Sequence, residues 1–230
     1  MTSDGARAEV LAAVRAALRF PLHQGADGAT AAAAPPSAVP APEHADHEAL
    51  TRLFCSELEA LGGSARTVHD PKACAADIKD TMQRQSLRSI AVQSSRLALA
   101  VGGCLRDCEV LRADELDRSE LAAVDCSLLE AGALLAESGS AVIITRGEGD
   151  RMLPYLPQTC FIVCEAHNVR AGMNDEALLC IADAAQAGAR GEALIMTGPS
   201  RTADIEKILV LGAHGPGFVR ALIMAQGQPT

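Results

Sequence analysis

The stretch that decides the fold is Ala193-Leu-Ile-Met-Thr-Gly-Pro-Ser-Arg-Thr-Ala-Asp-Ile-Glu206, which is followed closely by Gly212-Ala-His-Gly-Pro-Gly217. An apolar, strand-like run ends at Met196, and Gly198 and Pro199 then break regular structure. Loops that are held by rigid strands carry most functional groups in proteins. We therefore expect these two Gly/Pro turns to lie close together and to touch whatever the protein binds.

Backbone and side chain in the first turn both favour an anion. Gly198 lets the backbone approach a ligand closely, and Pro199 fixes the turn. Thr202 is predicted to cap a short helix through Leu209, whose free N–H groups would attract negative charge. Arg201 adds a planar, two-pronged donor for a carboxylate or a phosphate. The alternative is a capped helix with a turn that Arg201 merely holds in place.

Two acids limit the charge of that ligand. Asp204 and Glu206 fall in the first turn of the predicted helix, where they already complement its dipole. They would repel a dianionic phosphate. A monocarboxylate, or a phosphate shared with other donors, therefore fits better, and the chain has no P-loop or dinucleotide-binding glycine motif.

Two other loop residues are candidates. His214 lies in a segment too rich in Gly and Pro for a helix interior, and a loop histidine can act as a general acid or base near neutral pH. It can equally be hydrogen-bonded to a neighbouring turn. Arg151, in the segment Arg151-Met-Leu-Pro-Tyr-Leu-Pro157, can contact an anion or simply cap a turn.

The segment Glu137-Ser-Gly-Ser140 precedes a strongly β-branched run. Glu137 is a candidate general base, and it could instead pair with Arg201. Ser138 and Ser140 offer hydroxyl groups, while Gly139 allows close backbone approach. An ordinary turn into a strand explains the same residues.

Apolar periodicity outside these motifs alternates between helix and strand, which is typical of an α/β fold with a parallel or mixed sheet flanked by helices. Such sheets bind ligands beyond the carboxyl ends of their strands. We predict helices over 43–61, 71–85, 125–136 and 175–187, a helical turn over 151–156, and a helix or strand over 97–101. We predict strands over 65–68, 89–93, 109–111, 141–145, 159–164, 193–196 and 218–224.

The chain is organised in three parts. Residues 1–20 are predicted to form an amphipathic helix, and residues 21–42 form a linker rich in Ala and Pro, a composition that buries too little to fold alone. The first helix is therefore an arm that docks on the body or on a partner. Residues 43–228 form a single α/β domain.

Composition excludes several classes of function. The net charge is −9 and only 2% of residues are aromatic, which argues against nucleic-acid binding by charge or by stacking. No apolar run is long enough to span a bilayer, and the polar N-terminus lacks the apolar core of a secretory signal.

Eight cysteines without a secretory signal indicate reduced thiols in the cytoplasm. Their spacing contains no iron–sulfur run, and we expect no cofactor in this chain. The sharpest cluster is Cys160, Cys164 and His167. If 159–164 is a strand, the two cysteines point to one face as buried apolar side chains, and a metal site is the alternative.

The motifs together resemble the LUD domain family, in its lactate-utilization protein C type. They occur in order as Ala136-Glu-Ser-Gly-Ser140, the turn from Arg151 to Pro157, Gly198-Pro-Ser-Arg-Thr-Ala-Asp-Ile-Glu206 and Gly212-Ala-His-Gly-Pro216. The resemblance covers roughly residues 120–225, and here Ser-Gly-Ser replaces the commoner Thr-Gly form. The positions that match are Glu137, Ser138, Gly139, Arg151, Gly198, Ser200, Arg201, Thr202, Asp204, His214 and Gly215.

The resemblance implies a fold like that of the ribose-5-phosphate isomerase, CoA-transferase and 5-formyltetrahydrofolate cyclo-ligase group. It also implies a role in oxidising L-lactate to pyruvate alongside iron–sulfur partner subunits. We expect Glu137 and His214 to be the proton-transfer groups and the other matching residues to bind a small carboxylate or phosphate.

Two other functions are compatible with the sequence. The chain could be a stand-alone enzyme acting on a small phosphorylated or acyl substrate, by analogy with the fold group, although fold alone is a weak warrant for function. It could also be a non-catalytic interaction protein whose N-terminal arm binds redox subunits.

Overall fold

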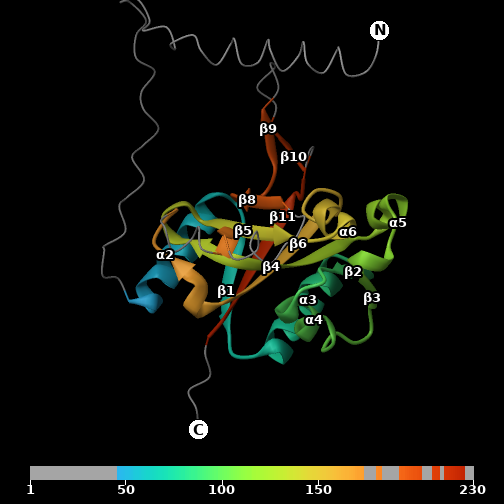
Figure 1. Cartoon of the computed structure of the whole chain (residues 1–230), viewed down its shortest axis with the longest axis horizontal. Helices are drawn as coiled ribbons and strands as arrows, with labels where there is room; N and C mark the ends of the chain where they lie inside the picture. Colours follow the sequence, from blue (N-terminus) through green and yellow to red (C-terminus); the bar gives the residue numbers. More distant parts are fainter. Residues whose placement is uncertain (1–45, 174–179, 183–191, 204–208, 213–214, 226–230) are drawn as a thin grey trace, which may run out of the picture. The chain divides into compact units, whose positions relative to one another are not determined.

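Six parallel strands form the centre of the fold, in the order β1-β11-β6-β4-β2-β3 (Figure 1). The computed structural model describes residues 46–173, 180–182, 192–203, 209–212 and 215–225. The predicted N-terminal helix and linker lie outside these residues, as does most of the helix predicted over 175–187. The predicted class, an α/β fold with a mostly parallel sheet flanked by helices, is confirmed.

Seven of the described strands follow the predicted apolar runs closely, and β4, β7, β9 and β10 are additions. They are β1 Ser64–Val68, β2 Ser89–Val92, β3 Glu109–Arg112, β4 Cys126–Leu135, β5 Ser140–Thr145, β6 Thr159–Glu165, β7 Val169–Arg170, β8 Glu192–Met196, β9 Arg201–Ala203, β10 Leu209–Leu211 and β11 Phe218–Met224.

Aspartates begin three of the helices. Asp46 and Asp70 each accept a hydrogen bond from a backbone N–H in the first turn, and Asp117 forms a reciprocal capping box with Glu120. Pro71 occupies the first position of its helix, where no N–H is needed. The helices are α2 His47–Ala60, α3 Pro71–Arg84, α4 Arg96–Gly102, α5 Arg118–Ala123 and α6 Glu148–Met152, with single 3₁₀ turns η1 Ala113–Glu115, η2 Ala136–Ser138 and η3 Ala166–Asn168.

The prediction of a helix over 125–136 is wrong, because this segment is the long strand β4. Its first half pairs in parallel with β2 and β6. Its second half pairs antiparallel with β5, and β5 pairs antiparallel with β8. The strand is buried along almost its whole length, so its apolar residues form a continuous run that periodicity alone cannot distinguish from a buried helix.

Two apolar cores lie on opposite faces of the parallel sheet. Phe161 and Val163 of β6 pack in the core that includes side chains of α3 and α4. Cys160, Ile162 and Cys164, on the other face of β6, pack in the core that includes side chains of α2, β5 and β8. The sheet is therefore covered on both faces, as a parallel sheet requires. No helix among the described residues is long and apolar enough to cross a membrane.

Candidate ligand-binding site

The two Gly/Pro turns lie side by side, which confirms that part of the sequence prediction. The backbone N–H of Ser200 donates to the carbonyl of Pro216 at 2.8 Å, and the N–H of Gly212 donates to the carbonyl of Ser200 at 2.9 Å. A Cβ placed on Gly215 would lie 3.4 Å from Cβ of Ser200, so the two turns pack closely. His214 lies outside the described residues.

The helix predicted from Thr202 to Leu209 is not formed at either end. Residues Arg201–Ala203 form β9, which pairs antiparallel with β10, and Thr202 lies opposite Val210. In such a pair the backbone N–H groups donate to carbonyls of the partner strand, and β-branched residues such as Thr and Val favour strands over helices. Thr202 therefore caps no helix, so no helix begins at this residue to offer free N–H groups to an anion. Asp204 and Glu206 lie outside the described residues.

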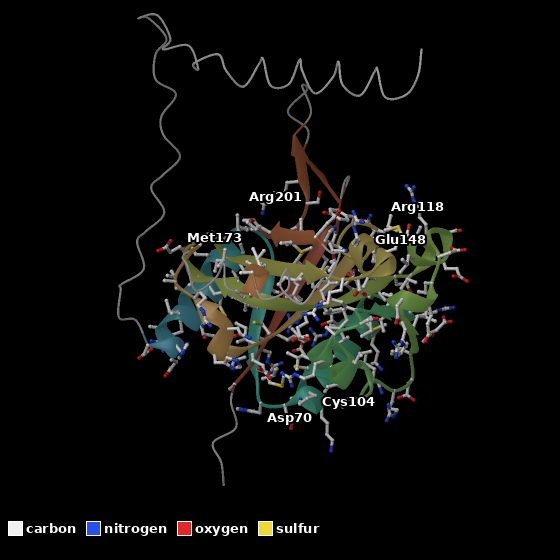
Figure 2. The ribbon with its side chains drawn as sticks, in the orientation of Figure 1. Asp70, Cys104, Arg118, Glu148, Met173 and Arg201 are labelled. Carbon is white, nitrogen blue, oxygen red and sulfur yellow. The ribbon has the colours of Figure 1, made fainter. Side chains whose placement is uncertain are left out.

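Arg201 lies at the foot of the β9–β10 hairpin and reaches the end of α2 (Figure 2). Its guanidinium donates to the backbone carbonyl of Leu61, the residue that ends α2. A cation here satisfies a free carbonyl and complements the negative end of the helix dipole. Arg201 is exposed, so its side chain remains accessible to solvent.

Gly198 packs against the same helix end. Its backbone is left-handed, with φ of 72°, and a Cβ there would lie 3.0 Å from Cβ of Leu61. Both the conformation and the close approach require glycine at this position. The turn that carries Arg201 is thus fixed on α2 by Gly198 and by the arginine itself.

The turn between β4 and β5 joins the same region through hydroxyl groups. Ser138 Oγ donates to Ser140 Oγ at 2.8 Å, and Ser140 Oγ lies 2.8 Å from Thr197 Oγ1. Thr197 directly precedes Gly198. A chain of three hydroxyls therefore connects the Ser-Gly-Ser turn with the turn of Arg201.

Gly139 serves packing at this turn. Its φ is 59°, and a Cβ there would lie 2.5 Å from the backbone nitrogen of Leu58 in α2. Glu137 lies half-buried in the same turn. Its backbone N–H donates to the backbone carbonyl of Ala171 at 2.9 Å, and its carboxylate lies against Gly172. Glu137 is thus positioned by the turn, as a residue with a fixed role would be.

Arg151 is the motif residue that the structure places elsewhere. It belongs to α6, which begins at Glu148 rather than at 151, and it forms an ion pair with Glu192. Glu192 begins β8, whereas the turn of Gly198 follows the other end of that strand, about 17 Å away at the usual rise per residue. The described contacts therefore do not bring Arg151 to the turn.

Cys160 and Cys164 are buried thiols on one face of β6, as predicted. Neither is exposed, and burial raises the pKa of the Cys160 thiol to about 12. Burial, with nearby Glu130 and Glu165, also raises the pKa of Cys164 well above its usual range. His167 is exposed and lies 3.4 Å from a carboxylate oxygen of Glu165. The structure favours the buried-thiol interpretation over the metal site.

Comparison with known proteins decides the family. The family model of the LUD domain matches residues 51–224, which is more than half of the chain. The chain belongs to the LUD domain family. This confirms the resemblance that the motifs suggested, and it places every motif residue from Glu137 to Gly215 within the LUD domain.

Curated relatives match this LUD chain over part of its length. They include "Lactate utilization protein C" of Geobacillus thermodenitrificans, 37% identical over 103 residues that make up 44% of this chain and 42% of that protein. The protein of the same name from Bacillus pumilus is 36% identical over 92 residues, 39% of this chain and 37% of the relative. "Uncharacterized protein YkgG" of Escherichia coli is 36% identical over 108 residues, 45% of each chain. The chain thus spans less than half the length of these relatives.

A solved structure shares the fold of this LUD domain. The crystal structure of a DUF162 family protein from Deinococcus radiodurans superposes with a TM-score of 0.58 at 17% identity, covering 79% of this chain and 99% of that chain. At this identity the likeness shows the fold alone. It agrees with the α/β arrangement described above.

Three residues of the candidate site were not predicted from the sequence. Leu61 receives Arg201, Thr197 completes the hydroxyl chain, and the side-chain amide of Gln158 donates to the carbonyl of Gly212 at 3.4 Å. Thr197 carried a signal, since it directly precedes Gly198. Leu61 and Gln158 carried none, because their contacts join distant parts of the chain.

Proposed function

We propose that this LUD protein serves L-lactate utilisation as an accessory or ligand-binding subunit. Two observations support the proposal: the family itself, and relatives from Geobacillus and Bacillus that carry the name "Lactate utilization protein C". The oxidation of L-lactate to pyruvate releases two electrons and two protons. In the proposal the electrons pass to iron–sulfur partner subunits, because this chain has no closely spaced cysteine run.

The proposed ligand site is the corner where three family motifs meet. The observation that carries it is the pair of backbone hydrogen bonds from Ser200 to Pro216 and from Gly212 to Ser200, which fixes the turns together. The exposed guanidinium of Arg201 would hold a small carboxylate, or a phosphate shared with other donors. Gly198, Ser200, Thr202, Asp204 and Gly215 would shape the surroundings.

Proton transfer is assigned to Glu137 and His214. Glu137 is half-buried in the turn that also carries Ser138 and Ser140, and such a fixed turn can orient a carboxylate toward a ligand. Gly139 lets that turn pack on α2. Arg151 remains a proposed ligand residue on the strength of the motif alone. We further propose a cytoplasmic location, because all eight cysteines are free thiols, as a reducing compartment favours.

Replacing Arg201 tests this assignment. We expect Arg201→Gln to remove the L-lactate binding event that belongs to the corner, and no binding event elsewhere on the chain, while lowering the melting temperature by no more than about 4 °C, since an exposed hydrogen bond is worth about 1 kcal/mol. Titration calorimetry and thermal unfolding of the full chain give the two readings. Arg88→Gln is the control, because Arg88 is exposed and precedes β2 at its amino end.

A collapse of the melting temperature would show that Arg201 is chiefly a structural link to α2. Turnover of a phosphorylated or acyl substrate by the isolated chain would instead support a stand-alone enzyme. The first result would overturn the proposed role of the corner, and the second would overturn the proposed accessory role of the chain.

A further inference from the structure

The parallel sheet changes its direction of growth between β2 and β4. After β2 the chain continues to β3, on the outer side of β2 away from β4. After β4 the next strand of the parallel sheet is β6, on the opposite side. Neighbouring strands whose connections diverge in this way leave a crevice beyond their carboxyl ends, where open α/β sheets bind ligands.

A pocket of about 270 Å³ lies at this point. It is formed by the segment that follows β2, by the middle of β4, by the end of β5 and by α6. Its polar and charged lining residues are Ser94, Ser95, Arg96, Glu130, Arg146 and Asp150. None of these residues belongs to the family motifs or to the corner of Arg201.

The pocket and the corner lie toward opposite ends of the β4–β5 hairpin. Gly132 and Ile144 line the pocket, near the register pair of Ala131 with Ile143. Glu137 and Gly139 form the closed turn at the other end, beyond the pair of Leu135 with Ser140. The pocket is therefore a separate place for a ligand.

The walls of the pocket are fixed by hydrogen bonds. The side-chain amide of Gln93, which is 2% exposed, donates to the carbonyl of Ile144 at 2.7 Å and accepts from the N–H of Glu130 at 2.8 Å. Glu130 in turn accepts from the N–H of Leu97 at 2.7 Å. Three strands and the start of α4 are thus held together around a preformed space, as small-molecule sites usually are.

Two hydroxyls and one guanidinium in this lining have no described protein partner that neutralises or pairs with them. Ser94 Oγ and Ser95 Oγ are buried and, among the described residues, have no hydrogen-bond partner. A buried polar atom without a partner is costly and calls for an explanation such as a ligand. Arg146 forms no ion pair with any described carboxylate, whereas Arg96 is paired with Glu165 at 2.7 Å. Arg146 is therefore the arginine that an incoming anion would meet.

Two acids set the charge that the pocket accepts. Asp150 is 3% exposed, and one of its oxygens accepts from the N–H of Ser94 at 3.1 Å. Burial and the nearby charge of Asp114 raise the pKa of Asp150. The carboxylates of Asp150 and Glu130 together disfavour the binding of a dianion. Both can accept a hydrogen bond from a hydroxyl of the ligand.

We infer that this pocket binds a small hydroxy monocarboxylate, whose carboxylate meets Arg146 and whose hydroxyl meets Ser95 and the acids Glu130 and Asp150. A volume of about 270 Å³ admits a molecule of a few carbon atoms with room to spare. The choice of L-lactate as the first probe rests on the proposed function. The chemistry of the pocket rests on the residues that line it.

Titration calorimetry on the full-length chain tests the inference with L-lactate, glycolate, acetate and inorganic phosphate. We expect the two hydroxy acids to bind, acetate to bind about threefold to tenfold more weakly because it lacks the hydroxyl, and phosphate to bind more weakly still. Arg146→Gln should weaken L-lactate binding about tenfold or more, since it removes a charged hydrogen bond.

Ser95→Ala separates binding from folding. Because Ser95 Oγ has no protein partner among the described residues, its loss should leave the melting temperature unchanged while weakening L-lactate binding about threefold to tenfold. Arg88→Gln, at the amino end of the same strand β2, should change neither quantity.

Three results would overturn the inference. They are equal L-lactate affinity in Arg146→Gln and Arg88→Gln, no binding of either hydroxy acid by the wild-type chain, and binding that only Arg201→Gln removes. The last result would leave the proposed function intact, with its ligand at the corner. The proposed function is tested by a different experiment, the oxidation of L-lactate in the presence of the partner subunits. Its failure is therefore distinguishable from a failure of this inference.

Discussion

Asp77 is a buried carboxylate that two arginines hold in place. It lies on α3 with its side chain 4% exposed, and it binds Arg220 of β11 through two contacts at 2.5 and 2.9 Å and Arg66 of β1 at 2.9 Å. Burial alone would raise the pKa of Asp77, but hydrogen bonds and charges from Arg220 and Arg66 hold it below its usual value. This residue ties α3 to two neighbouring strands.

Asp77 makes stability depend on pH in one direction. Because its folded pKa lies below the unfolded value, its contribution is present above about pH 4 and is lost as the pH falls through the folded pKa. We expect Asp77→Asn to lower the free energy of unfolding by at least about 2 kcal/mol at neutral pH, since it leaves Arg220 without its counter-charge. Urea unfolding at a series of pH values measures both effects.

Asp80→Asn on the same helix is the matched control. Its carboxylate is half-exposed and pairs with exposed Arg84, so its loss should cost less than about 1 kcal/mol. If the two variants have equal stability and equal pH profiles, the network of Asp77 does not stabilise the sheet as described.

Thiol chemistry tests how the cysteines are buried. Burial raises the pKa of Cys74, Cys126 and Cys160 to about 12 in each case, and the thiolate is the reactive form. We expect iodoacetamide to modify half-buried Cys104 (Figure 2) well before these three in the native chain, and all of them equally after unfolding. Peptide mass spectrometry over a time course shows the order. Early modification of Cys160 would contradict its place in the core.

At the scale of elements, the sequence predicted most of the parallel sheet. Runs such as 89–93, 159–164 and 218–224 became β2, β6 and β11 because each carries β-branched and apolar residues between clear breakers. The strand β4 was missed since burial on both faces removes the alternation that marks a strand. The helix predicted from Thr202 failed because pairing with β10 overrode a local capping signal.

The turn between β4 and β5 depends on Gly139. A side chain there would adopt a left-handed backbone, with φ of 59°, and would collide with the backbone of α2 at Leu58. Gly139→Ala should therefore cost more than about 1 kcal/mol of stability and loosen the turn that holds Glu137. Chemical unfolding measures the loss.

Gly147→Ala gives the comparison, because a Cβ there meets nothing within 4 Å and its φ is −125°. Gly147→Ala should lower the free energy of unfolding clearly less than Gly139→Ala does. Equal losses would mean that the approach of α2 to the turn is not what requires glycine at 139.

At the scale of the whole molecule, the motifs predicted the family and the meeting of two turns. The family was predictable because its motif residues occur in a fixed order along the chain. The two turns were predictable because Gly and Pro residues mark loops. The link from Arg201 to Leu61 spans 140 residues, and the pocket beyond β2 is assembled from four segments. Long-range pairings of this kind are set by strand order, which local patterns do not contain. The roles of the site residues remain predictions.

The central claim is that this chain is a subunit of lactate oxidation rather than an enzyme on its own. The most direct measurement is L-lactate-dependent reduction of an electron acceptor by the tagged full-length chain with the iron–sulfur proteins that co-purify with it. We predict that pyruvate forms only when the chain and those partners are both present, and that omission of the chain abolishes the rate. An unchanged rate without the chain, or turnover by the chain alone, would contradict the account.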